Sequence, residues 1–306
     1  MLIIKGHRSQ IRDLAFTTDG MAVASIAGKG YAISLWEATT GERRSYLSAK
    51  DDHPVLSMCI HPNGEELLAC SLWVGTRHWN LKTETFRRSA RGSGTGEVDQ
   101  ILISPDGEHC FFVHSPNWWD GYTTHVQFYS LRGRKTDHRS RQLASFGARF
   151  GGARCRSMSL TPDKRFLATA LQAGQQKEIR LLDLNQSRSK AVDLGDGQAV
   201  AFSPNGELLA IAVGEQIHLL SVSDLSRISE LRGHTQSVDH LAFSADGEKL
   251  LTGGEDQTVR MWDLASESEE QCYDWGIGQI SRVRFAPDGM RAAAGGEKQI
   301  VIWDVD

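Results

Sequence analysis

This chain of 306 residues lacks the features that would place it in a membrane or on nucleic acid. No apolar run approaches the length of a membrane span, and the three apolar residues before Lys5 are too few for a signal peptide. The formal net charge is −4, so no global basic field attracts phosphate backbones. We therefore expect neither a membrane nor a nucleic-acid partner.

Cysteine is scarce, and the five residues present form no Cys-x-x-Cys pair. Their number is odd and their spacing scattered, which argues against a disulfide framework. The cysteines are Cys59, Cys70, Cys110, Cys155 and Cys272, of which the first three lie in strand-like patterns. This usage is typical of buried thiols in a reducing compartment, and we expect a cytoplasmic protein.

Motifs of common catalytic, cofactor and metal sites are also missing. The glycine-rich stretch from Gly147 to Gly152 lacks the Lys-Ser/Thr of a phosphate-binding loop, and no strand-to-helix pattern surrounds it. The eleven histidines include no His-x-x-x-His pair. We therefore predict no catalytic residues, no cofactor and no metal, and we expect that the protein is not an enzyme.

What the chain does contain is a repeated unit, clearest between Gly233 and Leu264. It opens with Gly233-His234, passes through a turn at Asp246-Gly247 and closes with Trp262-Asp263. Alternating apolar residues between Gly and Asp turns predict short antiparallel strands. One such unit cannot bury its own apolar face, so copies of it are expected elsewhere.

Six further copies are found when Phe243 of that unit is taken as the anchor. Each anchor is followed by a turn that contains Asp, Asn or Gly, residues that tolerate or freely adopt the left-handed conformation. The intervals between anchors are 41 to 44 residues, except for 57 between copies three and four. In chain order the anchors are Phe16, Ile60, Ile103, Leu160, Phe202, Phe243 and Phe285.

The Gly-His opening, the Trp-Asp closing and this period resemble the WD-repeat β-propeller family. Both dipeptides occur together only in the sixth copy; Gly6-His7, Trp36-Glu37 and Trp303-Asp304 are partial matches. The resemblance covers essentially the whole chain. It implies an all-β fold of seven blades around a central channel.

The two ends of the chain are expected to pair with each other. Leu2-Ile3-Ile4 precedes the first Gly-His, where the family places an outer strand, and the chain ends directly after the third strand of copy seven. An N-terminal strand that closes the last blade removes an open edge. We predict a single domain over residues 1–306, enlarged between blades three and four by an insertion within about 114–152.

In the sixth copy, His234, Thr252, Asp256 and Trp262 match the family's hydrogen-bonded structural tetrad. A His-Asp-Thr set also suggests a nucleophilic triad. The resemblance implies a structural tie instead, and buried polar groups need partners in any case. Copies one and seven lack parts of the set, so we expect apolar packing to hold those blades.

The resemblance also implies where a partner binds, because contacts in this family often fall three and five residues after the Gly-His histidine. The corresponding positions form a ring at one end of the channel, which we call the top. The ring is acidic in blades three, five and six and basic in blades one and four. Predicted partner-binding residues in it are Arg12, Glu97, Asp99, Arg154, Arg156 and Asp239.

The insertion adds aromatic residues near this ring. A long hairpin around Ser115 to Tyr122 should project from the top, and Trp, Tyr and Arg dominate interface hot spots. In the alternative, the tryptophans fold back and cap the blade; a narrower interpretation is an aromatic cage for a cationic side chain. The predicted aromatic part of the docking surface is Trp73, Trp118, Trp119 and Tyr122, with Arg149 and Phe150 beside it.

We predict a non-catalytic scaffold that recruits a protein or peptide through top-face loops, as a monomer or as a subunit of a complex. Two alternatives stay open. A propeller enzyme would act on a small molecule in the channel, although the projected ring holds carboxylates and no histidine. A nucleic-acid-binding module would use Arg149 to Arg156, which conflicts with the acidic neighbours.

Overall fold

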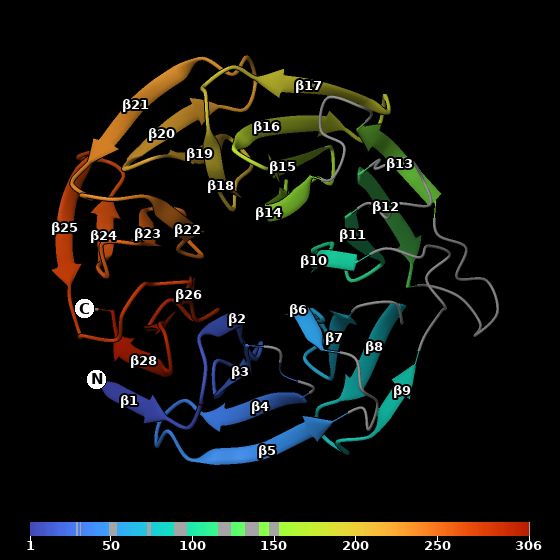
Figure 1. Ribbon diagram of the computed structural model, residues 1–306, viewed down its shortest axis with the longest axis vertical. Coiled ribbons are helices and arrows are strands. Elements are labelled where there is room, and N and C mark those ends of the chain that lie inside the picture. Colours follow the sequence, from blue (N-terminus) through green and yellow to red (C-terminus); the bar gives the residue numbers. More distant parts are fainter. Residues whose placement is uncertain are drawn as a thin grey trace.

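The computed structural model describes residues 1–28, 30, 32–48, 54–71, 75–88, 97–115, 124–131, 141–146 and 153–305. Within these ranges the chain forms β-strands and turns, and no helix long and apolar enough to cross a membrane. The strands assemble into seven four-stranded sheets, the blades, around a central channel (Figure 1). The predicted all-β, seven-bladed propeller is confirmed.

Each blade contributes one strand to each of four positions between the channel and the rim (Figure 1). The innermost strands of blades one to seven are β2 (Ile11–Phe16), β6 (Val55–Ile60), β10 (Glu97–Ile103), β14 (Arg154–Leu160), β18 (Gly197–Phe202), β22 (Val238–Phe243) and β26 (Arg282–Phe285). The second strands are β3 (Ala22–Ala27), β7 (Glu66–Ser71), β11 (His109–Ser115), β15 (Phe166–Ala173), β19 (Leu208–Val213), β23 (Lys249–Gly254) and β27 (Arg291–Gly295). The third strands are β4 (Ala32–Glu37), β8 (Gly75–Asn80), β12 (Thr124–Ser130), β16 (Gln176–Asp183), β20 (Gln216–Ser221), β24 (Val259–Asp263) and β28 (Gln299–Asp304). The rim strands are β5 (Arg43–Ser48), β9 (Phe86–Arg88), β13 (Arg141–Phe146), β17 (Arg188–Val192), β21 (Arg227–Arg232), β25 (Ser268–Tyr273) and β1 (Leu2–Lys5).

The N-terminal strand closes the ring. β1 pairs antiparallel with β28, with Leu2 opposite Ile302 and Lys5 opposite Gln299. In Figure 1 both chain ends lie together at the rim of blade seven. The side chain of Ile4 is buried and belongs to an apolar cluster shared with blade one. The predicted closure is confirmed, and we call the junction of blades seven and one the seam.

The apolar core lies between neighbouring blades. The second strands are buried on both faces because each sheet is sandwiched by two others, and they therefore read as nearly continuous apolar runs. In β3, for example, residues 22–26 are all buried. Ile26 and Ile33 of blade one share a cluster with Met58 and Trp79 of blade two. This packing makes the propeller a rigid frame for the loops at its two ends.

The turns between innermost and second strands lie at the bottom, the end of the channel opposite the predicted ring. In five blades a hydroxyl group donates to the Asx side chain two residues later, for example Thr17 Oγ1 to Asp19 Oδ1 and Ser203 Oγ to Asn205 Oδ1, both at 2.6 Å. The next residue has positive φ and is glycine in every blade except blade four, where Lys164 adopts a φ of 61°. The local sequence alone thus specifies these reversals.

Candidate functional site

A β-bulge near the start of the innermost strand recurs in blades one to six. The register against the second strand shifts by one residue in each, so that one residue is left outside the ladder. Bulges re-aim the side chain of the extra residue and often occur beside functional sites. The extra residues are Arg12, Leu56, Asp99, Arg156, Gln198 and Asp239. Four of the six, Arg12, Asp99, Arg156 and Asp239, are ring residues predicted from the sequence.

The top of the channel contains a cavity of about 580 Å³. Arg12, Leu56, Arg156 and Asp239 line it, so four of the bulge residues face one space. Ser281, which precedes β26 at the equivalent place in blade seven, lines it too. The charged side chains at this cavity are Arg12, Arg154, Arg156, Arg282 and Asp239. Among the described lining residues the cavity is therefore mainly cationic, whereas the projected ring was of mixed sign.

Polar contacts cross the channel mouth between blades that are not neighbours. Arg156 of blade four donates from Nη1 to Gln172 Oε1 at 2.6 Å and from Nη2 to Asp239 Oδ1 of blade six at 3.3 Å. Gln279 of blade seven donates to the other oxygen of Asp239 at 2.7 Å. The Asp239 carboxylate is therefore engaged on both oxygens, and the Arg156–Asp239 pair contributes no net charge.

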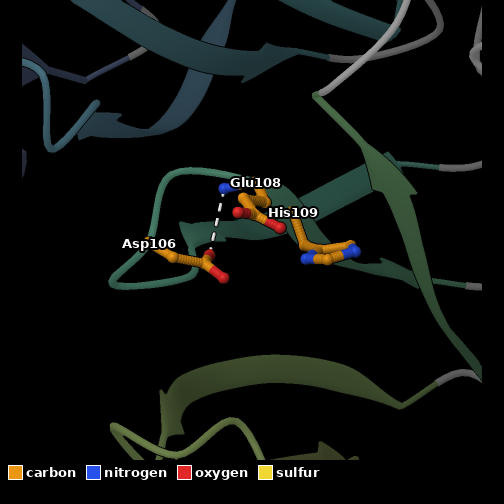
Figure 2. A group of neighbouring side chains, drawn as sticks. All are labelled: Asp106, Glu108 and His109. Carbon is orange, nitrogen blue, oxygen red and sulfur yellow. Dashed lines mark hydrogen bonds between the residues drawn. The ribbon is translucent and has the colours of Figure 1, made fainter.

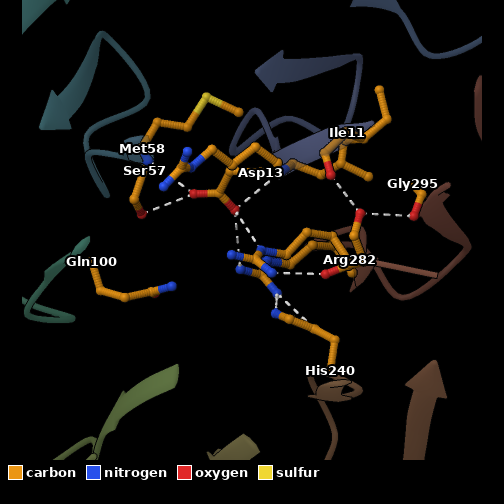
Figure 3. A network of polar contacts seen from close by, with 12 residues as sticks. Ile11, Asp13, Ser57, Met58, Gln100, His240, Arg282 and Gly295 are labelled. Atoms are coloured by element: carbon orange, nitrogen blue, oxygen red, sulfur yellow. Dashed lines mark hydrogen bonds and ion pairs between the residues drawn. The ribbon is translucent and has the colours of Figure 1, made fainter. Parts of the chain in front are cut away.

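Deeper in the channel, Asp13 of blade one joins three blades (Figure 3). Its Oδ2 accepts from Ser57 Oγ and from the Met58 backbone N–H of blade two, both at 2.9 Å. Its Oδ1 accepts from Arg282 Nε of blade seven at 3.3 Å. Only 4% of the Asp13 side chain is exposed. This buried carboxylate holds the seam together from the inside of the ring.

His240 of blade six completes this network, and the sequence did not predict it. Its Nε2 accepts from Arg284 Nη1 at 2.7 Å. Burial first, and then Arg284 and Arg282, lower the pKa of His240 well below 6.5. The ring is thus neutral near pH 7, and its acceptor nitrogen is occupied. A signal was available, because His240 directly follows the projected ring residue Asp239.

The predicted partner-binding residues divide into three groups. Arg12, Arg154, Arg156 and Asp239 line the cavity described above. Glu97 and Asp99 lie in β10, but their side chains lie outside the described part of the structure. The aromatic part of the surface stays a prediction, because its six residues lie outside the described residues: Trp73, Trp118, Trp119, Tyr122, Arg149 and Phe150.

The four polar residues of blade six lie together behind the channel wall. His234 Nδ1 is 2.8 Å from Asp256 Oδ2, and His234 Nε2 is 2.6 Å from Thr252 Oγ1. The Trp262 indole N–H donates to the same hydroxyl at 2.9 Å. Burial raises the pKa of Asp256, but hydrogen bonds from His234 and Thr235 outweigh it and lower the pKa overall. The Thr252 side chain is fully buried, so the arrangement ties β23 and β24 to the preceding loop and offers no nucleophile.

Comparisons with known proteins agree with this geometry. A family model described as "WD domain, G-beta repeat" matches residues 225–263 and 275–304, which include most of blades six and seven. The uncharacterised WD repeat-containing protein sll1491 of Synechocystis is 33% identical over 140 residues, 45% of this chain and 40% of that protein. WD repeat-containing protein 90 of Xenopus tropicalis is 24% identical over 286 residues, 89% of this chain and 15% of that protein. These matches support a WD-repeat family for the chain.

A further relative is described as target of rapamycin complex subunit wat1, from Schizosaccharomyces pombe. It is 32% identical over 90 residues, 28% of this chain and 29% of that protein. In all three relatives the match spans less than half of the relative's own length.

Blades one and seven keep only parts of the hydrogen-bonded set that blade six has. In blade one, Ser25 Oγ contacts His7 Nε2 at 2.8 Å and accepts from Trp36 Nε1 at 2.7 Å. In blade seven the indole nitrogen of Trp303 is buried and has no hydrogen-bond partner among the described residues. Trp303 instead packs against Trp275, with ring centroids 4.7 Å apart. Aromatic packing replaces the polar tie there.

One group of described residues has the composition of a metal site, at the bottom of blade three (Figure 2). Ligand atoms of Asp106, Glu108 and His109 lie within 4.8 Å of one another. Asp106, however, accepts from the Glu108 backbone N–H at 3.0 Å and pairs with Lys164 of blade four. Lys164 and then Ser104 lower the pKa of Asp106. The bottom turn common to the blades explains this cluster without a metal.

Proposed function

We propose that this WD-repeat chain is a non-catalytic scaffold that recruits a protein or peptide partner at the top of its central channel. The observation that carries the proposal is the set of bulges in the innermost strands, four of whose extra residues line one cavity. Bulges that serve only the fold would not need to present charged side chains to a common space. Arginine, the main charged residue here, is enriched in interfaces.

The family supports this assignment. WD-repeat proteins generally serve as protein-interaction scaffolds. By its name, the fission-yeast relative is a subunit of a complex. The rigid packing between blades fits the same role, because a partner then meets preformed loops and the cost of ordering them is small. We include in the proposed surface the aromatic residues predicted on blades two to four.

The enzyme alternative is less well supported by the channel chemistry. A general base in the channel needs an accessible lone pair on a group whose pKa lies near the working pH. His240 fails on both counts, because its Nε2 accepts from Arg284 and its pKa lies well below 6.5. Asp13 and Asp239 are likewise held by arginines. These groups position one another, which suits a binding surface.

A cytoplasmic location is part of the proposal. All five cysteines are free thiols, and Cys70, Cys110 and Cys155 are buried. Unpaired cysteines in a repeat protein are typical of a reducing compartment.

Site-specific photocrosslinking tests the use of the top face. Benzoylphenylalanine is placed at Gln10, an exposed cavity residue, or at Met290, which is 70% exposed beside a bottom turn. Each tagged protein is irradiated in a lysate of its source, and the crosslinked proteins are identified by mass spectrometry. We expect a defined partner that crosslinks from Gln10 and not from Met290, and that recovers this chain when it carries the tag. Crosslinks from Met290 alone, or none from either position, would contradict the proposal.

A further inference from the structure

The channel wall at the seam carries more positive than negative charge. Arg282 and Arg284, both from β26, share a single carboxylate, that of Asp13 on β2. Arg282 Nε lies 3.3 Å from Asp13 Oδ1, and Arg284 Nη2 lies 3.8 Å from the same oxygen. The other oxygen of Asp13 is taken by two donors from blade two. One carboxylate therefore serves two guanidinium groups (Figure 3 shows Asp13 and Arg282).

The remaining contacts of the two arginines supply acceptors but no negative charge. Arg284 Nη1 donates to the neutral His240 ring at 2.7 Å and to the Val283 carbonyl at 3.0 Å. Arg282 Nη1 donates to the Ser281 carbonyl at 2.7 Å. Asp239 on the neighbouring strand is held by Arg156 and Gln279. Among the described side chains, the cluster keeps an excess of one positive charge.

Such an excess is costly where water is partly excluded. Only 16% of the Arg282 side chain and 4% of the Asp13 side chain are exposed. Partial burial lowers the pKa of Arg284, whose side chain is 35% exposed, despite the opposing effect of Asp13. A buried charge without an equal counter-charge raises the free energy of the folded state, so an anion that enters the site stabilises it.

The cavity gives an anion access to this cluster. Arg282 lines it together with Ser281 and Gln10, and its volume of about 580 Å³ is within the range of ligand pockets. We infer that the seam side of the channel mouth binds an anionic side chain, carboxylate or phosphate, carried by a peptide segment of the partner. This inference rests on the proposed function and names the partner's chemistry. A guanidinium offers paired N–H donors in the geometry that both anions accept.

A peptide fits the site better than a nucleic acid does. Nucleic-acid binding draws on many phosphate contacts along a basic track. Among the described side chains, the excess charge of this cluster lies at one cavity, in a chain of net charge −4. A single acidic side chain that enters the cavity matches this distribution.

Binding of defined peptides by calorimetry tests the inference. The probes are hexaglutamate, hexaglutamine, hexalysine, a hexapeptide of alternating phosphoserine and glycine, and inorganic phosphate alone. We expect hexaglutamate or the phosphopeptide to bind at least about tenfold more tightly than hexaglutamine and hexalysine. The tighter of the two acidic peptides identifies the anion as carboxylate or phosphate. Equal binding of hexaglutamate, the phosphopeptide and hexaglutamine, or a peptide no tighter than inorganic phosphate, overturns the inference.

A pair of matched variants locates the binding. Gln10→Glu adds a negative charge at an exposed residue that lines the cavity, and should weaken the acidic peptide about five- to tenfold. Gln186→Glu makes the same change on the exposed turn between β16 and β17, away from the channel, and should leave the affinity unchanged. Arg282→Gln should also weaken binding, and its fold is checked by thermal denaturation because Arg282 holds the seam. Equal affinities of the two glutamate variants would place the acidic peptide elsewhere and refute the inference.

The two proposals fail in different ways. If a partner crosslinks from Gln10 but acidic peptides bind no better than hexaglutamine, the anion inference is wrong and the scaffold function stands. If no partner crosslinks from the top face, the scaffold function is wrong, whatever the peptides do.

Discussion

The indole N–H of Trp262 donates to the buried hydroxyl of Thr252 at 2.9 Å, and this contact joins two strands of blade six. The same hydroxyl lies 2.6 Å from His234 Nε2. Asp256 accepts a hydrogen bond from the Nδ1–H of His234, so the Nε2 of His234 is an acceptor. The Thr252 hydroxyl therefore donates to Nε2 and accepts from the Trp262 indole. Every polar atom of the tie thus has a partner, which is what a structural role requires.

Removal of this hydroxyl should destabilise the protein. Thr252→Val keeps the volume but leaves the Trp262 N–H and His234 Nε2 without a partner, which should lower the free energy of unfolding by about 2 kcal/mol. Thr235→Val makes the same chemical change at an exposed position of the adjacent loop and should change it by less than about 0.5 kcal/mol. Urea denaturation of both variants checks this. Equal effects of the two would show that the tie contributes nothing.

A hydroxyl group introduced into blade seven at the position of Thr252 in blade six should stabilise the protein. Ala294 in blade seven is equivalent to Thr252 in blade six. Thr252 follows by two residues Leu250, which pairs with Trp262, and Ala294 follows by two residues Ala292, which pairs with Trp303. Ala294→Ser should give the buried Trp303 N–H an acceptor and raise the free energy of unfolding by about 1 kcal/mol. A double-mutant cycle with Trp303→Phe provides the control. If the serine stabilises the Trp303→Phe variant equally, the gain does not come from the indole.

Protonation of His7 at acidic pH should lower the free energy of unfolding. Burial, and then Arg43, lower the pKa of His7 from 6.5 to about 4. Between these values the unfolded state binds the proton and the folded state does not, so stability is complete above pH 6.5 and falls as the pH drops toward 4. The loss from this ring should be roughly 1–3 kcal/mol, reduced by its partial exposure.

His7→Gln should flatten that dependence, because glutamine can still contact Ser25 and does not titrate. The measurement is the free energy of unfolding at several pH values from 8 to 4. The buried His240 contributes with the same sign, so some slope should remain in the variant. If the free energy of unfolding depends on pH equally in the variant and in the wild type, His7 does not cause the loss of stability in acid.

Ring closure by β1 should depend on one face of the strand. Ile4 is 3% exposed and Ile3 is 37% exposed. Ile4→Ala should therefore cost about 2–4 kcal/mol, and Ile3→Ala should cost less than about 1 kcal/mol. Deletion of residues 1–5 should lower the melting temperature sharply, because it opens the edge of β28. An unchanged melting temperature after the deletion would contradict closure by this strand.

Local signals made the blades predictable from the sequence. Asp246-Gly247 and its equivalents specify a left-handed turn within a few residues, and apolar alternation specifies the flanking strands. Closure followed from the positions of the first and last strands, which leave one rim place for β1. The turns and strands need no contacts between distant parts of the chain, whereas closure pairs its two ends and was predicted from the resemblance to the WD-repeat family.

The seam cluster was not predictable in this way. Asp13, His240 and Arg284 meet because three innermost strands converge on the channel, and the bulges set which side chains face each other. A one-residue register shift moves every later side chain to the opposite face, and no local pattern marks it. One signal was available: Arg284 lies in a strand that lines the channel, where equivalent positions such as Ala15 and Ala242 carry small apolar side chains.

Amide hydrogen exchange of the protein, alone and with the partner captured from Gln10, tests most directly whether that partner docks at the channel mouth. We predict added protection at the bulged starts of the innermost strands, around Arg12, Arg156 and Asp239, and little change in the bottom turns. Protection confined to the bottom turns, for example around Asp288, or to the rim strands would contradict the account.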